Sequence, residues 1–139
     1  LVGTATEINA DLIRILERDR YIPVIAPVGV DAEGNTYNIN ADTVAGKVAA
    51  ALGAEKLILL TDIVGVKIKG ELASTLTKAD VARHIASGEI SGGMIPKTDC
   101  CVDALAGGVK KTYIIDGRVA HAVLLEIFTD AGIGTEIIN

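Results

Sequence analysis

Apolar residues recur along this chain with two different spacings, one typical of helices and the other typical of strands. Over residues 6–20 they follow helical spacing, and we expect Thr6 to cap this helix. Residues 40–52 are Ala-rich and predict a second helix, opened by Asn40 or Asp42. Further helices are predicted over 77–87, with Thr77 as the N-cap, and over 95–106 and 120–128.

Between the predicted helices, short runs of apolar and β-branched residues predict strands. The clearest is 56–61 (KLILLT), an apolar run typical of a strand buried on both faces. Residues 109–115 form a second buried strand, and 135–138 form a short last strand. Because strands alternate with helices, we expect an α/β layered domain with a largely parallel sheet.

The segment 21–30 (YIPVIAPVGV) is almost continuously apolar, which also predicts a strand covered on both faces. Its two prolines favour an edge position or an irregular path, because proline donates no hydrogen bond to a sheet. Turn-forming residues at 31–35 and the alternation at 36–40 then predict the return strand of a hairpin. Residues 63–73 are interrupted by glycines and predict a loop or a short hairpin.

Composition and charge limit the possible functions. The 139 residues fit one domain, and a hydrophobic content of 50% excludes intrinsic disorder. A net charge of −5 argues against binding to nucleic acid, which needs a clustered positive field. No apolar run is long enough to span a bilayer, and two adjacent cysteines cannot form a secreted disulfide scaffold. We therefore expect a soluble, intracellular protein and, because an initiator Met is absent, the removal of an upstream segment.

The segment 88–97 (GEISGGMIPK) is the first of three candidate sites. Its glycines let a backbone approach an anion, and the following helix start is expected to offer free N–H groups. Lys97 lies near that helix start, where the helix dipole disfavours a cation, so an anionic ligand would explain it. The segment is not a Walker A loop, because Met94 stands where that motif has Lys. A Gly-rich turn followed by a solvated Lys explains the pattern equally well.

The other two candidate segments follow predicted strands. In 38–42 (NINAD), Asn40 and Asp42 are ordinary N-cap and first-turn residues. The functional interpretation has Asn38 and Asp42 facing a cleft. Asp62 follows the clearest buried strand, and ligands of open α/β sheets bind beyond the carboxyl ends of strands. A turn-forming Asp is the commoner alternative at that position.

The remaining candidates have simpler explanations. On a helix, adjacent Cys100 and Cys101 point about 100° apart, so we expect one of them to face the core. His84 is expected to be a solvated residue of its helix, and His121 and Glu126 fit surface positions of the last helix. No Cys or His pattern supports a zinc site, and no Ser–His–Asp or Cys–His pattern supports nucleophilic catalysis.

Six segments, taken in order, carry a resemblance to a known family. They are 21–25, 38–45, 57–66, 92–97, 114–122 and 124–135. Together they resemble the acetylglutamate kinases of arginine biosynthesis, over essentially the whole chain. The resemblance implies the three-layer α/β/α sandwich of the amino acid kinases, with a mainly parallel sheet, and places the ATP-binding carboxy-terminal half at 1–139. The family's amino-terminal half, with its Lys, Gly-rich loop and acetylglutamate-binding Arg, has no counterpart before Leu1.

The resemblance also implies a role for each candidate. Lys97 would stabilise charge on the transferred phosphoryl group, Asp42 would organise the catalytic lysines, and Asn38 would hold acetylglutamate. ATP would bind with Mg²⁺ bridging its phosphates, and no side chain is implied as a metal ligand. The side-chain carboxylate of N-acetyl-L-glutamate would attack the γ-phosphorus, and it needs no general base because it is already ionised. The residues implied to line the ATP site are Asp62, Ile63, Val64, Gly65, Val66, Lys67, Glu89, Ile90 and Ser91.

Regulation and partners are implied in the same way. In arginine-inhibited members, the region matching His121, Glu126, Gly132 and Gly134 contributes to the arginine site, where a carboxylate suits a guanidinium. Photosynthetic members bind a PII signalling protein, and the paired cysteines resemble their sequences. The full-length kinase is expected to be a homo-oligomer, in the cytoplasm or, in a photosynthetic eukaryote, the plastid stroma.

Two alternatives stay open. Another amino acid kinase, such as a carbamate kinase or an aspartokinase, would share the fold, although segments 38–42 and 92–97 favour an acetylglutamate kinase. A stand-alone nucleotide- or arginine-binding module without catalysis would explain the presence of one half only. Under the leading interpretation, we expect this chain alone to be nearly inactive, with an apolar face exposed where the other half docks.

Overall fold

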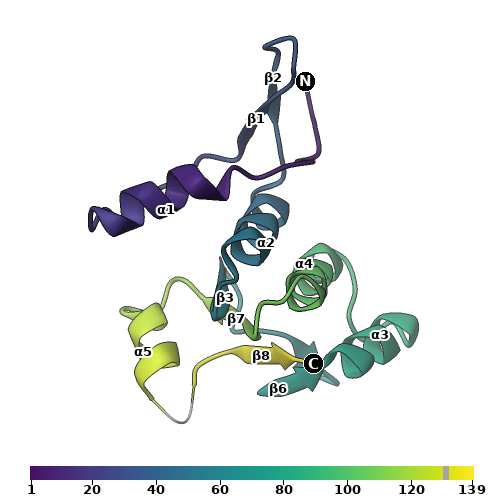
Figure 1. Ribbon diagram of the computed structural model, residues 1–139. Helices are drawn as coiled ribbons and strands as arrows, with labels where there is room; N and C mark the ends of the chain where they lie inside the picture. The colour runs from purple at the N-terminus through teal and green to yellow at the C-terminus, as the bar shows by residue number, and fades with distance from the viewer. Residues whose placement is uncertain (130–131) are drawn as a thin grey trace.

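The computed structural model describes residues 1–129 and 132–139, so two residues of the segment 124–135 lie outside the described residues. Its central sheet has four strands in the order β3-β7-β8-β6 (Figure 1). β3 pairs with β7 in parallel and β6 with β8 in parallel, whereas β7 and β8 are antiparallel. The prediction of a mainly parallel sheet is therefore confirmed. The strands are β3 (Lys56–Thr61), β6 (Thr75–Thr77), β7 (Lys111–Asp116) and β8 (Thr135–Ile138).

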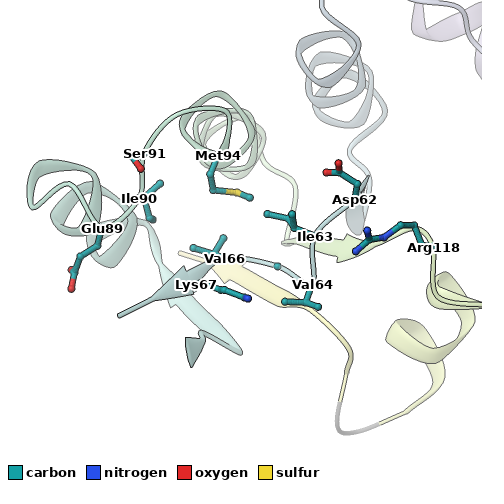
Figure 2. Close-up of a pocket in the computed structure, with 11 residues that line it drawn as sticks. Asp62, Ile63, Val64, Val66, Lys67, Glu89, Ile90, Ser91, Met94 and Arg118 are labelled. Carbon is teal, nitrogen blue, oxygen red and sulfur yellow. The ribbon is translucent and has the colours of Figure 1, made fainter. Parts of the chain in front are cut away.

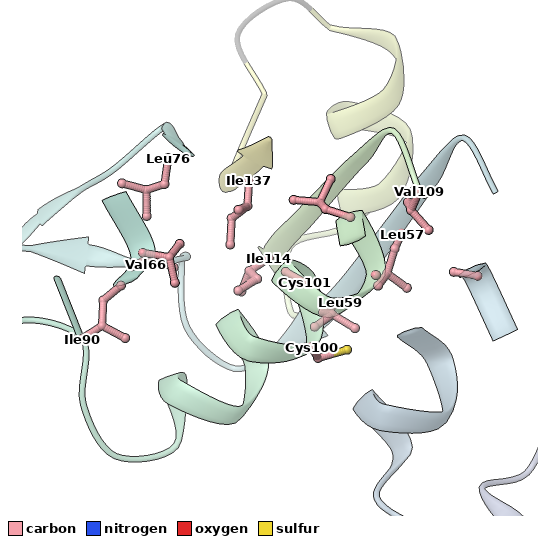
Figure 3. Close-up of a cluster of buried hydrophobic side chains, with 14 residues drawn as sticks. Leu57, Leu59, Val66, Leu76, Ile90, Cys100, Cys101, Val109, Ile114 and Ile137 are labelled. Carbon is pink, nitrogen blue, oxygen red and sulfur yellow. The ribbon is translucent and has the colours of Figure 1, made fainter. Parts of the chain in front are cut away.

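Helices cover both faces of this sheet, which confirms the three-layer architecture. The main core lies on one face, where Leu59 and Ile114 from the strands pack with Cys101 and Leu105 of α4 (Figure 3). On the other face, Tyr113 and Ile115 of β7 pack against α5. Figure 1 accordingly shows α5 and α4 on opposite sides of β3 and β7. The covering helices are α2 (Ala41–Leu52), α3 (Lys78–Ala86), α4 (Met94–Ala106) and α5 (Ala122–Phe128).

Side-chain caps determine where two of these helices begin, as their sequences predict. The Asn40 side chain accepts a hydrogen bond from the Thr43 amide and so opens α2. Thr77 and Asp80 form a reciprocal capping box at the start of α3. Thr77 also ends β6, a short strand that the sequence pattern did not predict.

α4 packs closely on α2 through a small residue. A Cβ atom at Gly46 of α2 would lie 2.9 Å from the Cys100 sulfur, so the helices approach only because position 46 lacks a side chain. The prediction that one of the paired cysteines faces the core is confirmed by Cys101, which is fully buried. Cys100 is also buried, because it faces α2.

The amino-terminal part of the chain lies on the far side of α2 from the sheet (Figure 1). It comprises α1 (Ala10–Arg18) and the antiparallel hairpin of β1 (Val28–Val30) and β2 (Thr36–Asn38). The predicted hairpin is confirmed, and so is the short hairpin within 63–73, which is formed by β4 (Lys67–Ile68) and β5 (Glu71–Leu72). The predicted cap at Thr6 is wrong, because Asn9 accepts the capping bond from Leu12 and α1 begins later.

The prediction of a buried strand over 21–30 is also wrong. Only Val28–Val30 is a strand, and the side chains of Ile22 and Val24 are 90% and 95% exposed. Within the described part of the chain, no strand pairs with 21–27, and prolines at 23 and 27 remove two amide donors from it. The apolar pattern shows that the segment can be buried, but burial also needs a partner surface.

Two adjacent leucines of β3 provide a test of this layering. Leu59 is 4% exposed and faces the main core, whereas Leu60 is 54% exposed on the opposite face. We expect Leu59→Ala to lower the free energy of unfolding by about 2–5 kcal/mol, because it removes buried methyl groups and leaves a cavity. Leu60→Ala should cost less than about 1 kcal/mol, because that side chain is half in water. Urea denaturation measures both, and equal losses would contradict this orientation of β3.

Candidate active site

A cavity of about 350 Å³ opens beyond the carboxyl ends of β3 and β7 (Figure 2). All nine residues predicted to line an ATP site meet here, from the 62–67 loop after β3 and from 89–91 before α4. Two further residues, Met94 and Arg118, complete the lining. The volume lies within the range of about 300–1,000 Å³ that is usual for small-molecule sites.

The 62–67 loop packs closely against Thr135, the first residue of β8. Gly65 has a φ of 140°, and a Cβ atom there would lie 2.8 Å from the Thr135 hydroxyl oxygen. Next to it, the Val66 amide donates a hydrogen bond of 2.8 Å to the same hydroxyl. Only glycine fits this conformation at this distance from a neighbour, so the loop has one defined path.

Arg118 brings a cation to the cavity from the turn after β7. It forms a two-point ion pair with Asp116, with Nε and Nη2 at 2.9 and 2.8 Å from the two carboxylate oxygens. These hydrogen bonds lower the pKa of Asp116 to about 2. Figure 2 shows Arg118 beside Asp62, the residue that follows β3. Sequence analysis did not identify Arg118, although it follows the second buried strand, as Asp62 follows the first.

Glu89 is held on the opposite side of the cavity. Its carboxylate accepts hydrogen bonds from His84 Nδ1 at 2.6 Å and from the Ser87 hydroxyl at 2.9 Å. The hydrogen bond from His84 contributes most to a pKa of Glu89 below its ordinary value. The prediction of a solvated His84 is therefore wrong, because this side chain is only 14% exposed and binds Glu89.

Lys97 and Asp42 join α4 to α2. Their Nζ and Oδ2 atoms lie 2.9 Å apart, and each side chain is about one-quarter exposed. Asp42 stands in the first turn of α2, where the dipole favours an anion, and it compensates the cation near the start of α4. The pair lies outside the cavity lining, one helical turn from the lining residue Met94.

The first three residues of α4 offer no free amide, whereas the amides of Gly92 and Gly93 just before them donate no hydrogen bond within the described residues. The amides of Met94 and Ile95 donate to the carbonyls of Ser91 and Gly92, at 3.3 and 3.2 Å, and Pro96 has no amide hydrogen. The side chain of Lys97 adds a positive charge near this helix start. Lys67 and Arg118 supply the cationic groups of the cavity lining itself.

Asn38 lies on the hairpin, away from the cavity lining. Its backbone pairs with Val28 of β1, and its side chain is exposed. Nothing in the structure joins the Asn38 side chain to the Lys97–Asp42 pair by a hydrogen bond within the described residues. The expected contact of Asn38 with acetylglutamate stays a prediction.

The four residues predicted for an effector lie just before α5, on it and in the segment after it. Glu126 accepts a hydrogen bond of 2.7 Å from the Ile133 amide, and a Cβ atom at Gly132 would lie 3.1 Å from its carboxylate. A Cβ atom at Gly134 would overlap the Ile114 carbonyl oxygen. His121 precedes α5 with a φ of 59° and is exposed. The structure thus brings Glu126 and Gly132 together, whereas the His121 side chain makes no hydrogen bond or ion pair within the described residues, and only its carbonyl accepts a bond, from the Leu125 amide.

The described residues were also compared with what a metal site, a membrane span or a second ligand cavity requires. Over residues 1–129 and 132–139, no group of three or more His, Cys, Asp or Glu side chains is placed to hold a metal ion. In the same described ranges, no helix has the length and apolarity needed to cross a membrane. A larger cavity of about 900 Å³ lies between α1, the 23–26 segment and the hairpin, and its lining is mostly apolar.

Comparison with known sequences identifies relatives of the whole chain. The model of the amino acid kinase family matches residues 1–116. The acetylglutamate kinase of Pelobacter propionicus is 66% identical over 137 residues, which are 98% of this chain and 47% of that relative. The acetylglutamate kinase of Geobacter sulfurreducens is 61% identical with the same two coverages. The chain thus spans about half the length of the curated relatives it matches.

Solved structures give a similar result. The N-acetylglutamate synthase of Neisseria gonorrhoeae, complexed with coenzyme A and N-acetyl-glutamate, matches with a TM-score of 0.90 and 30% identity, over 99% of this chain and 32% of that one. The same synthase with coenzyme A and L-arginine matches with a TM-score of 0.89, at the same identity and coverages. The carbamate kinase of Giardia lamblia, with a TM-score of 0.74 and 19% identity over 99% of this chain and 46% of that one, shows likeness of fold alone.

The Asp116–Arg118 pair predicts a dependence of stability on pH. The pKa of Asp116 is lowered from 3.8 to about 2, so the folded protein binds fewer protons at this carboxyl than the unfolded chain. The resulting stabilisation is complete above about pH 4 and is lost as the pH falls toward about 2. We expect Asp116→Asn to be less stable than the wild type at neutral pH and to lose less stability on acidification. Urea midpoints between these pH values measure this effect.

An exposed aspartate provides the control for this experiment. Asp103 makes no side-chain hydrogen bond or ion pair within the part of the chain that the structure describes. Asp103→Asn should therefore follow the wild-type curve. Parallel curves for Asp116→Asn and the wild type would show that the pair contributes no pH-dependent stability.

Proposed function

This chain belongs to the amino acid kinase family, and we propose that it forms the ATP-binding half of an acetylglutamate kinase. The reaction is transfer of the γ-phosphoryl group of ATP to the side-chain carboxylate of N-acetyl-L-glutamate, in arginine biosynthesis. Support comes from relatives of that name at 61% and 66% identity. The observation that carries the proposal is the cavity beyond β3 and β7, one turn along α4 from the Lys97–Asp42 pair.

ATP occupies the cavity in this proposal. The 62–67 loop and Met94 supply apolar surface, and Lys67 and Arg118 supply positive charge for the phosphates. Mg²⁺ would be held mainly by the phosphate oxygens of ATP, because the described side chains form no cluster of three or more metal ligands. The bound ion would neutralise phosphate charge.

Lys97 is the proposed catalytic residue. Its ammonium group stabilises the charge that develops on the phosphoryl group during transfer, and Asp42 holds the ammonium in place through the bond of 2.9 Å. The attacking carboxylate is ionised at neutral pH, so the chemistry needs no general base. Asn38, with its exposed amide, is proposed to bind the acetylglutamate.

Arginine sensitivity is a separate part of the proposal. Glu126 is the carboxylate that would pair with a guanidinium near α5, and the similarity to a synthase solved with L-arginine supports arginine as the effector. Binding of a PII protein, assembly into a homo-oligomer and location in the cytoplasm or plastid stroma stay predictions. We also propose that residues 1–139 act as one domain and that the other half of the kinase covers the exposed 21–27 segment.

Substrate choice separates the proposed function from its alternatives. We expect the full-length protein to convert ATP to ADP when N-acetyl-L-glutamate is present, with little turnover on carbamate or L-aspartate. ADP release in a coupled assay measures all three substrates under the same conditions. Turnover on carbamate or aspartate instead would identify another amino acid kinase. Binding of ATP without turnover on any substrate would identify a binding module.

Removal of the Lys97 charge tests the proposed catalytic role. We expect Lys97→Ala to lower kcat about 10²- to 10³-fold, as for the loss of one group that stabilises a transition state, with a smaller change in the KM for ATP. Lys110→Ala is the matched control, because Lys110 is 73% exposed and only pairs loosely with Glu55. An unchanged kcat for Lys97→Ala would exclude this residue from the chemistry.

A further inference from the structure

The loop that lines the cavity is attached to the sheet by one buried side chain. Thr135 is the first residue of β8, and its Oγ1 atom accepts the hydrogen bond from the Val66 amide at 2.8 Å. The two residues are 69 positions apart in the sequence and are 0% and 1% exposed. Thr135 does not line the cavity, so its contact with the site passes through the loop.

Gly65 makes a second contact with the same side chain. A Cβ atom at this position would lie 2.8 Å from Thr135 Oγ1 and 3.2 Å from the Thr135 amide nitrogen. The loop is therefore seated on Thr135 by packing at residue 65 and by a hydrogen bond at residue 66. The Thr135 side chain thus contacts the loop at two adjacent residues.

The position of Thr135 is itself fixed by its neighbours. Its backbone pairs with Ile114 in the antiparallel register of β7 and β8. The preceding residue, Gly134, lies so close to the Ile114 carbonyl that no side chain fits there. One residue earlier, the Ile133 amide is bound by Glu126. Because its backbone is fixed on both sides, Thr135 presents its hydroxyl to the loop in one defined position.

Resting on the proposed function, we propose that Thr135 is a positioning residue for ATP. Its hydroxyl fixes the Val66 amide and thereby sets the shape of the 62–67 loop against which the nucleotide lies. Without this acceptor, a buried amide would lose its partner, and the loop would move to satisfy that amide elsewhere. ATP binding should weaken in consequence, whereas binding of acetylglutamate does not depend on this loop.

Thr135→Val tests the proposal in the full-length enzyme, because valine keeps the shape of threonine and lacks the acceptor. We expect the dissociation constant for ATP to rise about tenfold, which corresponds to about 1.4 kcal/mol. The KM for N-acetyl-L-glutamate should stay within about twofold of the wild type. Thr135→Ser, which keeps the hydroxyl, should restore ATP affinity to within about twofold. Calorimetry with Mg-ATP and steady-state kinetics measure these quantities.

Thr112→Val is the matched control. Thr112 is also fully buried in the sheet, and its hydroxyl donates to the Ile137 carbonyl rather than to the loop. The control should lower the melting temperature without changing the affinity for ATP. Equal losses of ATP affinity in Thr112→Val and Thr135→Val would overturn the positioning role, as would an unchanged affinity in Thr135→Val.

Two further outcomes are informative. If Thr135→Val does not fold, Gly65→Ala displaces the loop from the same hydroxyl through a substitution in the loop itself, and it should weaken ATP binding in the same selective way. Unchanged ATP affinity in Gly65→Ala would then overturn the proposal. If the wild-type enzyme does not bind ATP, the proposed function fails, and the positioning role fails with it.

Discussion

The parallel pairing of β3 with β7 is the constraint on which the candidate site depends. In register, Thr61 lies opposite Asp116, so both strands end at the same edge of the sheet. The chain then leaves β3 through the 62–67 loop and leaves β7 through the turn that carries Arg118. Two segments about fifty residues apart in sequence therefore line one cavity, because parallel strands place their carboxyl ends together.

Charge at the site comes from side chains that other side chains hold in place. The amides of the first residues of α4 are bonded or absent, which leaves those of Gly92 and Gly93, just before the helix, as the backbone donors nearest to its start. Lys97 supplies a cation there, and Asp42 from α2 offsets the unfavourable dipole. Arg118 is likewise held by Asp116, and Glu89 by His84. Ion pairs of this kind orient their charges before a ligand arrives.

Local patterns predicted much of the fold, since strands 56–61 and 135–138 and the caps at Asn40 and Thr77 are found as expected. The caps depend on neighbours a few residues away, and both strands find a partner strand in the central sheet. The segment 21–30 is where the prediction from local pattern was wrong, because only its last three residues form a strand. Its apolar pattern is that of a buried strand, but a strand forms only if another backbone lies beside it, and a pattern in one segment carries no information about that partner.

The same limit explains which site residues were predicted and which were not. The cavity-lining residues of 62–67 and 89–91 stand in recognisable motifs, and the structure brings them together. Thr135 carries no such signal, because a threonine at the start of a strand is ordinary and its partner amide is 69 residues away. From sequence, Gly65 is one of two glycines in the predicted loop 63–73. In the structure, the close contact with Thr135 shows why position 65 is a glycine. The importance of either residue therefore becomes visible only after the chain has folded.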